Sequence, residues 1–522
     1  MPDVPLAADL LRRTPPGSLG LWLLGLLVET LAVALIPFVL LQKKDPGSTV
    51  AWLLALVFLP GAGATLFLLF GRDRVRLPVQ WKREADDRLR ALRHHRHRPR
   101  LSELTRELAL ERHASPIERE LFRLAVLLAG VEPSQGNAVT LLNDGEATYA
   151  EIGGAIDAAE RHVYAEYYLV QRGKAAAWFG ERLMAAARRG VAVKLLIDGY
   201  GSFWIGRRWV RALRAAGVEV AFFLPARLML LQPMNLRNHR KIVVVDGHTG
   251  FTGGINIMDE YLGEDRRGRP TAPWRDTHLA VRGPAAQALC RVFELDWHFA
   301  TRQPIRSDEV EPALDHRKGA AAATEGRLAE AVNTKPSEAT VAIVQSGPDV
   351  AGAARETIHR LFFSAIGLAR SRVYITTPYF IPDRSIAVAL ATAALRGVDV
   401  RLLFPSRSNH PVVFLAGRSF YEELLDAGVR IYEYGPGMIH AKTMVVDGHV
   451  SLVGSSNMDL RSFRLNFEVH AVVRDEATAR ELEASFLADL EASRLLDAEA
   501  FRQRGRRTRI AEGAARLLSP LM

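Results

Sequence analysis

The sequence predicts an α/β protein built from two similar halves and preceded by a helical hairpin. A polar pattern occurs twice at identical spacing, strand–helix–strand segments recur before each copy, and two long apolar runs lie near the N-terminus. Self-similarity of this kind indicates a duplicated unit. With 522 residues, of which 48% are hydrophobic, the chain is long enough to bury two substantial cores.

The repeated pattern combines a histidine, a lysine, an aspartate and an asparagine. The first copy consists of His239, Lys241, Asp246 and Asn256, and the second, 201 residues later, of His440, Lys442, Asp447 and Asn457. Four polar identities at three equal spacings are improbable by chance. The residues between each lysine and aspartate are mostly strand-favouring and apolar, which predicts a buried strand in each half.

The chemistry of these side chains suits a phosphodiester. Residues two apart on a strand share a face, so each histidine is expected beside its lysine. One imidazole can attack phosphorus, and a second can donate a proton to the departing oxygen. Two lysines, with Asn256 and Asn457 contacting the phosphate, would neutralise the charge on its oxygens in the transition state. We therefore expect one site shared by both halves, with no metal and no cofactor.

The two aspartates of the pattern have two possible roles. Asp246 and Asp447 have the opposite strand parity to the histidines, and each is followed by glycine. An Asp-Gly pair between two apolar runs is a strong hairpin signal. A catalytic role and a purely turn-forming role both stay open.

A nucleophilic histidine usually needs a carboxylate on its other ring nitrogen to fix its tautomer and orientation. Each half offers a candidate downstream of its motif, namely Asp276 and Glu468. We predict that these two carboxylates orient the histidines. The alternative is a solvated acid at a strand end, and only proximity to a histidine separates the two readings.

The paired motifs resemble those of the phospholipase D superfamily, and the chain is similar along nearly its whole length to bacterial cardiolipin synthases. Beyond the motifs, the resemblance rests on 235–239, 260–263, 274–278, 283–284, 346–349, 378–382, 461–463 and 516–520. It implies duplicated phospholipase D-type domains, each a mixed sheet flanked by helices, with the active site at their interface.

The resemblance also implies a reaction. Two phosphatidylglycerol molecules would be joined into cardiolipin, with release of glycerol, through a phosphatidyl-histidine intermediate. It implies that His239 is the nucleophile and that His440 is the acid and then the base. It also places Lys241, Asp246, Lys442 and Asp447 in the catalytic set. The phospholipid substrate is the expected partner, and the oligomeric state stays open.

Three other functions are compatible with parts of the sequence. A phospholipase D of the same fold would transfer the phosphatidyl group to water, and a nuclease would use the same motifs on nucleic acid. A catalytically inactive membrane scaffold is the third. The two intact motifs argue against the scaffold, and the apolar runs argue against a nucleic-acid partner.

The N-terminal part predicts a membrane anchor. Residues 19–41 and 50–70 are nearly continuously apolar, and each run has about the 20 residues that a helix needs to cross a bilayer. Residues 72–100 then contain eleven Lys or Arg against four Asp or Glu. Positive charge beside a span predicts a cytoplasmic flank, and it attracts anionic lipid. We therefore expect a multi-pass protein of the bacterial inner membrane with cytoplasmic catalytic domains.

These patterns together predict the division of the chain. Residues 1–71 form the anchor, 72–130 a basic juxtamembrane segment and 131–301 the first phospholipase D-like domain. Residues 302–340 form a charged, alanine-rich linker, and 341–522 the second domain. The single cysteine, Cys290, excludes an intrachain disulfide.

Overall fold

The structure is a computed structural model that describes residues 18–41, 46–68, 80, 82–84, 115–129, 132–224, 236–305, 339–348 and 356–519. The chain divides into two compact units, residues 1–77 and 78–522. Most of the basic run 72–100 and of the expected linker 302–340 lies outside the described residues.

The N-terminal unit is helical. Helix α2 (Ser18–Leu41) contains one stretch, Trp22–Leu41, that is long and apolar enough to cross a membrane, with a mean hydropathy of 2.4. The second apolar run forms two shorter helices, α3 (Pro46–Phe58) and α4 (Pro60–Leu66), instead of the single helix that its composition predicts. Leu59, between the two helices, is not helical, because the proline ring sterically disfavours the helical conformation in the residue before it. Pro60 is the first residue of the next helix.

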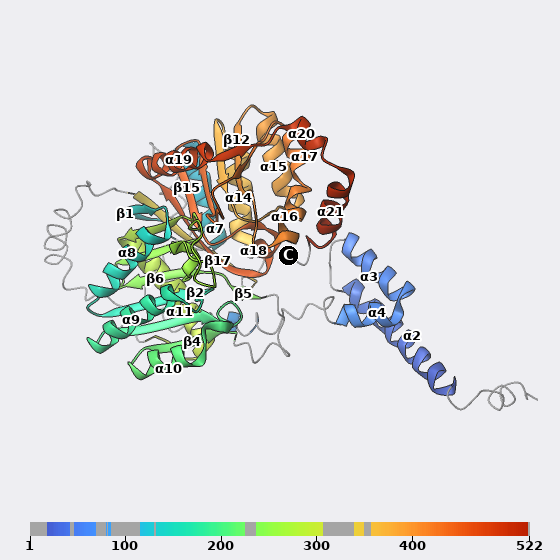
Figure 1. Cartoon of the computed structure of the whole chain (residues 1–522), viewed down its shortest axis with the longest axis horizontal. Helices are drawn as coiled ribbons and strands as arrows, with labels where there is room; N and C mark the ends of the chain where they lie inside the picture. Colours follow the sequence, from blue (N-terminus) through green and yellow to red (C-terminus); the bar gives the residue numbers. More distant parts are fainter. Residues whose placement is uncertain are drawn as a thin grey trace, which may run out of the picture. The chain divides into compact units, whose positions relative to one another are not determined.

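The second unit, residues 78–522, is organised around one large mixed sheet that contains strands from both halves (Figure 1). The first half contributes, in spatial order, β1 (Ser134–Leu142), β8 (His278–Arg282), β7 (Thr249–Gly253), β6 (Lys241–Val245), β2 (His162–Tyr167), β3 (Ala192–Asp198) and β4 (Glu219–Phe223). The second half contributes β9 (Ala339–Ser346), β17 (Asn466–Arg474), β15 (Val450–Gly454), β14 (Thr443–Val446), β10 (Arg372–Thr376), β12 (Asp399–Pro405) and β13 (Arg430–Tyr434), followed by β18 (Ser493–Leu495).

The strand order confirms the duplication. Each half repeats the same seven-strand order, and the halves join where β1 pairs antiparallel with β9. In each half three consecutive strands, β2–β3–β4 or β10–β12–β13, run parallel, and the motif strand pairs antiparallel beside them. The two halves therefore share one sheet across their junction. Three short strands lie off this order: β5 (Arg237–Asn238) pairs with β17, and β11 (Phe380–Ile381) pairs with β16 (Met458–Asp459).

Helices cover both faces of the sheet. In the first half α8 (Gly145–Asp157), α9 (Lys174–Arg188) and α10 (Arg207–Ala215) cover one face, and α11 (Pro284–Thr301) covers the other. In the second half α14 (Thr357–Leu368), α15 (Arg384–Leu395) and α17 (Tyr421–Asp426) cover one face, and α19 (Glu476–Glu491) covers the other. The remaining helices are α16 (Pro411–Arg418), α18 (Leu460–Arg464), α20 (Ala498–Arg502), α21 (Arg506–Leu517) and the short η2 (Phe203–Ile205) and η4 (Asp259–Leu262).

Side-chain alternation explains how the motif strands serve this three-layer arrangement. On β6, Val243 and Val245 pack under α8 and α9, whereas Ile242 and Val244 pack under α11. Successive side chains of a strand point to opposite faces, so a strand covered on both faces is apolar throughout. The predicted buried strands are confirmed, and their burial places the polar motif residues at the strand ends.

One helix lies in a stretch that the sequence assigned to the juxtamembrane segment. Residues Pro116–Ala129 form α7, which packs against α14 and β9. Ile117, Leu121, Phe122 and Ala125 are buried in the core of the second half. This part of the expected basic segment therefore belongs to the core of the second unit.

Candidate active site

His239 lies at the junction between the two halves. It follows β5, which pairs parallel with the start of β17, and its backbone N–H donates to the carbonyl of Phe467 at 2.9 Å. Its Nδ1 lies 3.1 Å from both carboxylate oxygens of Glu468. The first-half histidine is thus paired with the carboxylate of the second half.

His440 has the reciprocal arrangement. Its backbone N–H donates to the carbonyl of Arg275 at 2.6 Å, and its Nδ1 lies 2.8 Å from Oδ2 of Asp276. The hydroxyl of Tyr261 lies 3.0 Å from the same ring nitrogen and donates to Asp276 at 2.9 Å. Both carboxylates are fully buried against a histidine, so neither is the solvated strand-end acid of the alternative reading.

The two lysines are buried beside the histidines. Nζ of each lysine donates to the backbone carbonyl of the histidine two residues before it, and the distance is 2.6 Å for Lys241. Nζ of Lys442 also lies 2.8 Å from Nδ1 and 3.2 Å from Nε2 of His440. Burial lowers the pKa of Lys241 to about 7 and that of Lys442 to about 8. Each lysine also lowers the pKa of the histidine in the opposite motif, so the two motifs form one electrostatic unit.

The carboxylates stay ionised despite their burial. Burial by itself raises the pKa of Glu468, but His239 and Lys241 outweigh it and lower the value to about 2. Ser455 and Asn466 donate further hydrogen bonds to the same carboxylate. For Asp276, Lys442 and His440 likewise outweigh burial and lower the pKa. Two buried negative charges thus balance the two lysines.

The two asparagines of the motifs are buried close to this centre. Asn256 is 4% exposed, and its side-chain oxygen accepts the backbone N–H of Leu169 at 3.3 Å. Asn457 is 5% exposed, and its side-chain oxygen has no hydrogen-bond partner among the described residues. A buried amide with unused hydrogen-bonding capacity is suited to a polar ligand.

The structure places Asp246 and Asp447 in the hairpin turns at the far ends of the motif strands. Both have positive φ, 51° and 54°, and each precedes a glycine of positive φ. The carboxylate of Asp246 accepts backbone N–H groups of Glu160, Arg161 and His162, and that of Asp447 accepts those of Arg370, Ser371 and Arg372. These contacts match the turn-forming interpretation, because among the described residues the carboxylates bind backbone N–H groups of the adjoining turn and no motif histidine or lysine.

We expect Asp447→Ala to lower stability and leave chemistry largely intact. The substitution removes the acceptor of three backbone N–H groups in an exposed turn, and each net hydrogen bond lost costs about 0.5 to 1.5 kcal/mol. Asp447→Asn keeps an acceptor and tolerates positive φ, so it should lose less. Denaturant unfolding of both variants and the turnover of the folded fraction check this. A turnover loss of several orders of magnitude in fully folded Asp447→Asn would instead support a catalytic role.

Four buried histidines have lowered pKa values. Burial lowers the pKa of His239 and His470 to about 4 and that of His440 and His278 to about 3. His278 accepts the N–H of Ile255 and His470 that of Ser456, in the segments that lead to Asn256 and Asn457. These histidines are therefore neutral in the folded protein near neutral pH.

This burial predicts a loss of stability in mild acid. Unfolding exposes each histidine to water, where it binds a proton below a pH of about 6.5, so the unfolded state takes up more protons as the pH falls from about 6.5 to 4. The slope is about 1.4 kcal/mol per pH unit for each histidine. Glutamine does not titrate, so we expect the free energy of unfolding of His470→Gln to depend less steeply on pH between pH 7 and 4.5, as measured by denaturant unfolding. An unchanged slope would contradict the assignment.

Aromatic side chains line the site, although no pattern in the sequence predicted a role for them. The Tyr168 ring lies 4.9 Å from that of His239, and the rings of Trp274 and Tyr379 lie 5.3 and 6.1 Å from that of His440. Tyr261 contacts both His440 and Asp276, as described above. The tyrosines and Trp274 stand in segments that carry the family resemblance or the internal repeat, but only proximity reveals their contact with the histidines.

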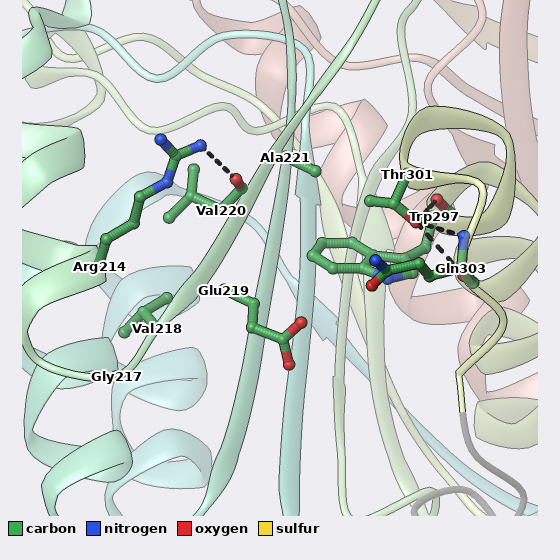
Figure 2. Close-up of a pocket in the computed structure, with 9 residues that line it drawn as sticks. All are labelled: Arg214, Gly217, Val218, Glu219, Val220, Ala221, Trp297, Thr301 and Gln303. Atoms are coloured by element: carbon green, nitrogen blue, oxygen red, sulfur yellow. Dashed lines mark hydrogen bonds between the residues drawn. The ribbon is translucent and has the colours of Figure 1, made fainter.

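The hollow in Figure 2 lies at the edge of the sheet and holds none of the predicted site residues. It has a volume of about 440 Å³ and is lined by Arg214, 217–221, Trp297, Thr301 and Gln303. Within the described part of the chain, no group of three or more His, Cys, Asp or Glu side chains could hold a metal ion. The paired motifs are thus the centre of the candidate site.

Comparisons with known proteins identify the family of the chain. A family model described as "Cardiolipin synthase, PLD-like domain" matches residues 153–266 and 362–490, and one described as "Phospholipase_D-nuclease N-terminal" matches residues 30–72. The chain is 38% identical over 467 residues to a cardiolipin synthase of Geobacillus kaustophilus, covering 89% of this chain and 86% of that protein. It is also 38% identical over 511 residues to a cardiolipin synthase of Alkalihalophilus pseudofirmus, covering 97% and 96%.

The chain belongs to the cardiolipin synthase family. Membership of the cardiolipin synthase family confirms the resemblance seen in the motifs and makes the chain an enzyme of the phospholipase D superfamily. The crystal structure of a phosphatidylserine synthase from Haemophilus influenzae has a similar fold, with a TM-score of 0.56 and 15% identity, covering 77% of this chain and all of that one.

Proposed function

We propose that the protein transfers a phosphatidyl group from one phosphatidylglycerol to a hydroxyl of a second, which yields cardiolipin and glycerol. One observation carries the proposal: each motif histidine is paired with a buried carboxylate from the opposite half, with the two motif lysines buried beside them. Membership of the cardiolipin synthase family supports the same reaction.

In the first step, His239 attacks the donor phosphorus. Glu468 occupies its Nδ1 and holds that nitrogen as the donor, which leaves Nε2 as the nucleophile. The phosphorus–nitrogen bond forms as the bond between phosphorus and the glycerol oxygen breaks. His440 gives its proton to that oxygen, and glycerol leaves.

The second step reverses these roles. His440, now neutral, accepts the proton of an acceptor hydroxyl, whose oxygen attacks phosphorus and displaces His239. Asp276 and Tyr261 hold the ring of His440 in both steps. Lys241, Lys442, Asn256 and Asn457 are assigned to the phosphate oxygens, where they stabilise the charge of the transition state.

We assign the protonated form of His440 to the complex with the donor lipid and not to the free protein. In the free protein burial lowers the pKa of His440 to about 3, so it carries no proton to donate near neutral pH. A phosphodiester anion between the motifs adds negative charge, and a nearby opposite charge raises the pKa of an imidazole. Donor binding thus supplies the charge that lets His440 act as the acid.

We assign Asp246 and Asp447 to the turns and not to the chemistry. Their carboxylates hold the backbone that precedes β2 and β10, which fixes the hairpins whose opposite ends carry the motif histidines and lysines. This assignment replaces the catalytic role that the family resemblance implied for them.

Anchoring by the N-terminal unit is part of the proposal. Helix α2 would cross the bacterial inner membrane, with α3 and α4 as further apolar elements, and the basic run would keep the catalytic unit on the cytoplasmic side. The two domains are proposed as residues 131–301 and 341–522, joined by 302–340 and preceded by the anchor 1–71 and the segment 72–130.

The experiment is mass spectrometry of lipids after the full-length protein is incubated with phosphatidylglycerol in mixed micelles containing a chelator. Cardiolipin and glycerol in equal amounts support the proposed reaction. Phosphatidic acid without cardiolipin would indicate a hydrolase of the same fold. Cleavage of DNA without lipid turnover would indicate a nuclease.

A further inference from the structure

A second cationic group lies next to the motif residues. Arg237 belongs to β5, two residues before His239, and is only 6% exposed. Its guanidinium stacks over the ring of Tyr200, with the central carbon 4.2 Å from the ring centroid. The strand pairing of Arg237 with Asn466 fixes this arginine at the junction of the two halves.

The guanidinium of Arg237 is incompletely satisfied. One terminal nitrogen donates to the carbonyl of Leu236 at 2.6 Å, but the buried Nε has no hydrogen-bond partner in the part of the chain that the structure describes. Asp198 lies near, yet its carboxylate accepts the backbone N–H groups of Tyr200, Gly201 and Asn238. No carboxylate of the described residues forms an ion pair with Arg237. Burying a guanidinium without an ion pair costs free energy of folding, and a bound anion would offset that cost.

An arginine of the other half acts electrostatically on Arg237. Arg461 stands in α18, four residues after Asn457. Burial first, and then the like charge of Arg461, lowers the pKa of Arg237, and both arginines act on Tyr168. Tyr168 in turn packs against His239, and Nζ of Lys241 lies 5.6 Å from its ring centroid. Tyr168 is therefore a shared neighbour of the motif histidine and the motif lysine of the first half.

We propose that Arg237 binds the phosphate of the acceptor phospholipid. The inference rests on the proposed function, in which two phosphodiester anions enter one site. Lys241 and Lys442 serve the phosphorus that reacts, so the acceptor phosphate needs a cation of its own. In phosphatidylglycerol that phosphate is separated from the reacting hydroxyl by a three-carbon glycerol, and a planar guanidinium fork matches phosphate geometry.

The surrounding loop is suited to a lipid ligand. Tyr200 is 46% exposed, and Phe203 and Trp204 in the following turn are 55% and 81% exposed. Asp198 ties this loop to the backbone just before His239 through the hydrogen bonds given above. Exposed aromatic side chains favour the interface between lipid and water, so an acceptor could pass from a bilayer to Arg237 along this loop.

The test compares two acceptors that share one donor. Phosphatidylglycerol mixed with isotopically labelled glycerol gives labelled phosphatidylglycerol by reversal of the first step, which uses a neutral acceptor. Cardiolipin formation uses an anionic acceptor and the same phosphatidyl-histidine. The ratio of the two rates comes from the same protein molecules, so it does not depend on how much of a variant is folded.

We expect Arg237→Gln to lower the ratio of cardiolipin formation to glycerol exchange by about tenfold or more, because charge-assisted hydrogen bonds are the strong ones. Arg237→Lys keeps the charge without the fork and should fall in between. Arg396→Gln is the matched control: it removes an arginine that binds two backbone carbonyls, those of Gly367 and Ala369, and should leave the ratio unchanged.

Other outcomes overturn the inference. Equal losses of both rates in Arg237→Gln would assign Arg237 to the donor or to the fold, and an unchanged ratio would remove its role in acceptor binding. Wild-type protein that exchanges glycerol but makes no cardiolipin would refute the proposed function, and the acceptor site with it. These results are distinguishable in one assay.

Discussion

His239→Ala should abolish phosphatidyl transfer, whereas His440→Ala should retain the first chemical step when the leaving group needs no acid. With phosphatidylglycerol as donor, both variants lose several orders of magnitude, because acid–base catalysis alone typically contributes about 10² to 10⁴. With phosphatidyl-p-nitrophenol the leaving group departs as an anion without a proton. A pre-steady-state burst of p-nitrophenolate from His440→Ala, and none from His239→Ala, is the expected result.

The same experiment decides which histidine is the nucleophile. A burst from His239→Ala, with none from His440→Ala, would exchange the two assigned roles. Wild-type-like turnover of phosphatidylglycerol in either variant would refute the mechanism. Circular dichroism and denaturant unfolding provide the control. Ser455 and Asn466 still donate to Glu468 when His239 is removed, and Tyr261 still donates to Asp276 when His440 is removed, so both variants should fold.

Glu468→Gln should impair His239, and Asp276→Asn should impair His440, each by about 10² to 10⁴ in turnover. The neutral amide can present its nitrogen to Nδ1 and favour the wrong tautomer, as the corresponding change in serine protease triads does. Turnover measured at saturating phosphatidylglycerol gives the loss. A change of less than tenfold in a folded variant would show that the carboxylate is a bystander.

The crossed pairing makes a sharper prediction with the activated donor. Glu468→Gln should lose the burst of p-nitrophenolate because its partner His239 is the nucleophile. Asp276→Asn should keep the burst because its partner His440 acts on the leaving group. Residues that act as a unit are non-additive, so Glu468→Gln in the His239→Ala background should cost little more. The opposite assignment of bursts would mean that each carboxylate serves the histidine of its own half.

Much of the fold could be predicted because it depends on local patterns. The apolar residues 242–245 predicted a buried strand, and their alternation between the two helix layers follows from strand geometry. The Asp-Gly pairs predicted the two hairpins, which the positive φ of Asp246 and Asp447 confirms. The strand–helix–strand repeat likewise appears as β2–α9–β3 and β10–α15–β12.

Other features depended on context that no local pattern contains. The second apolar run has the length of a span, but Leu59 and Pro60 interrupt it. Helix α7 follows a basic run, yet its apolar face packs in the core of the second half. The aspartates of the two motifs could be read as catalytic or structural, and only the backbone N–H groups around their carboxylates favour the structural role.

The sequence alone identified the residues proposed to do the chemistry. The equal spacing of two histidines and two lysines places each pair on one face of a strand, and these side chains are suited to a phosphodiester. Tertiary structure alone decided their partners. Alternation along a strand determines which face a side chain occupies, but not which distant strand lies beside it. The pairing of β5 with β17, and of Arg275 with Ile439, crosses the halves, and so places Glu468 on His239 and Asp276 on His440.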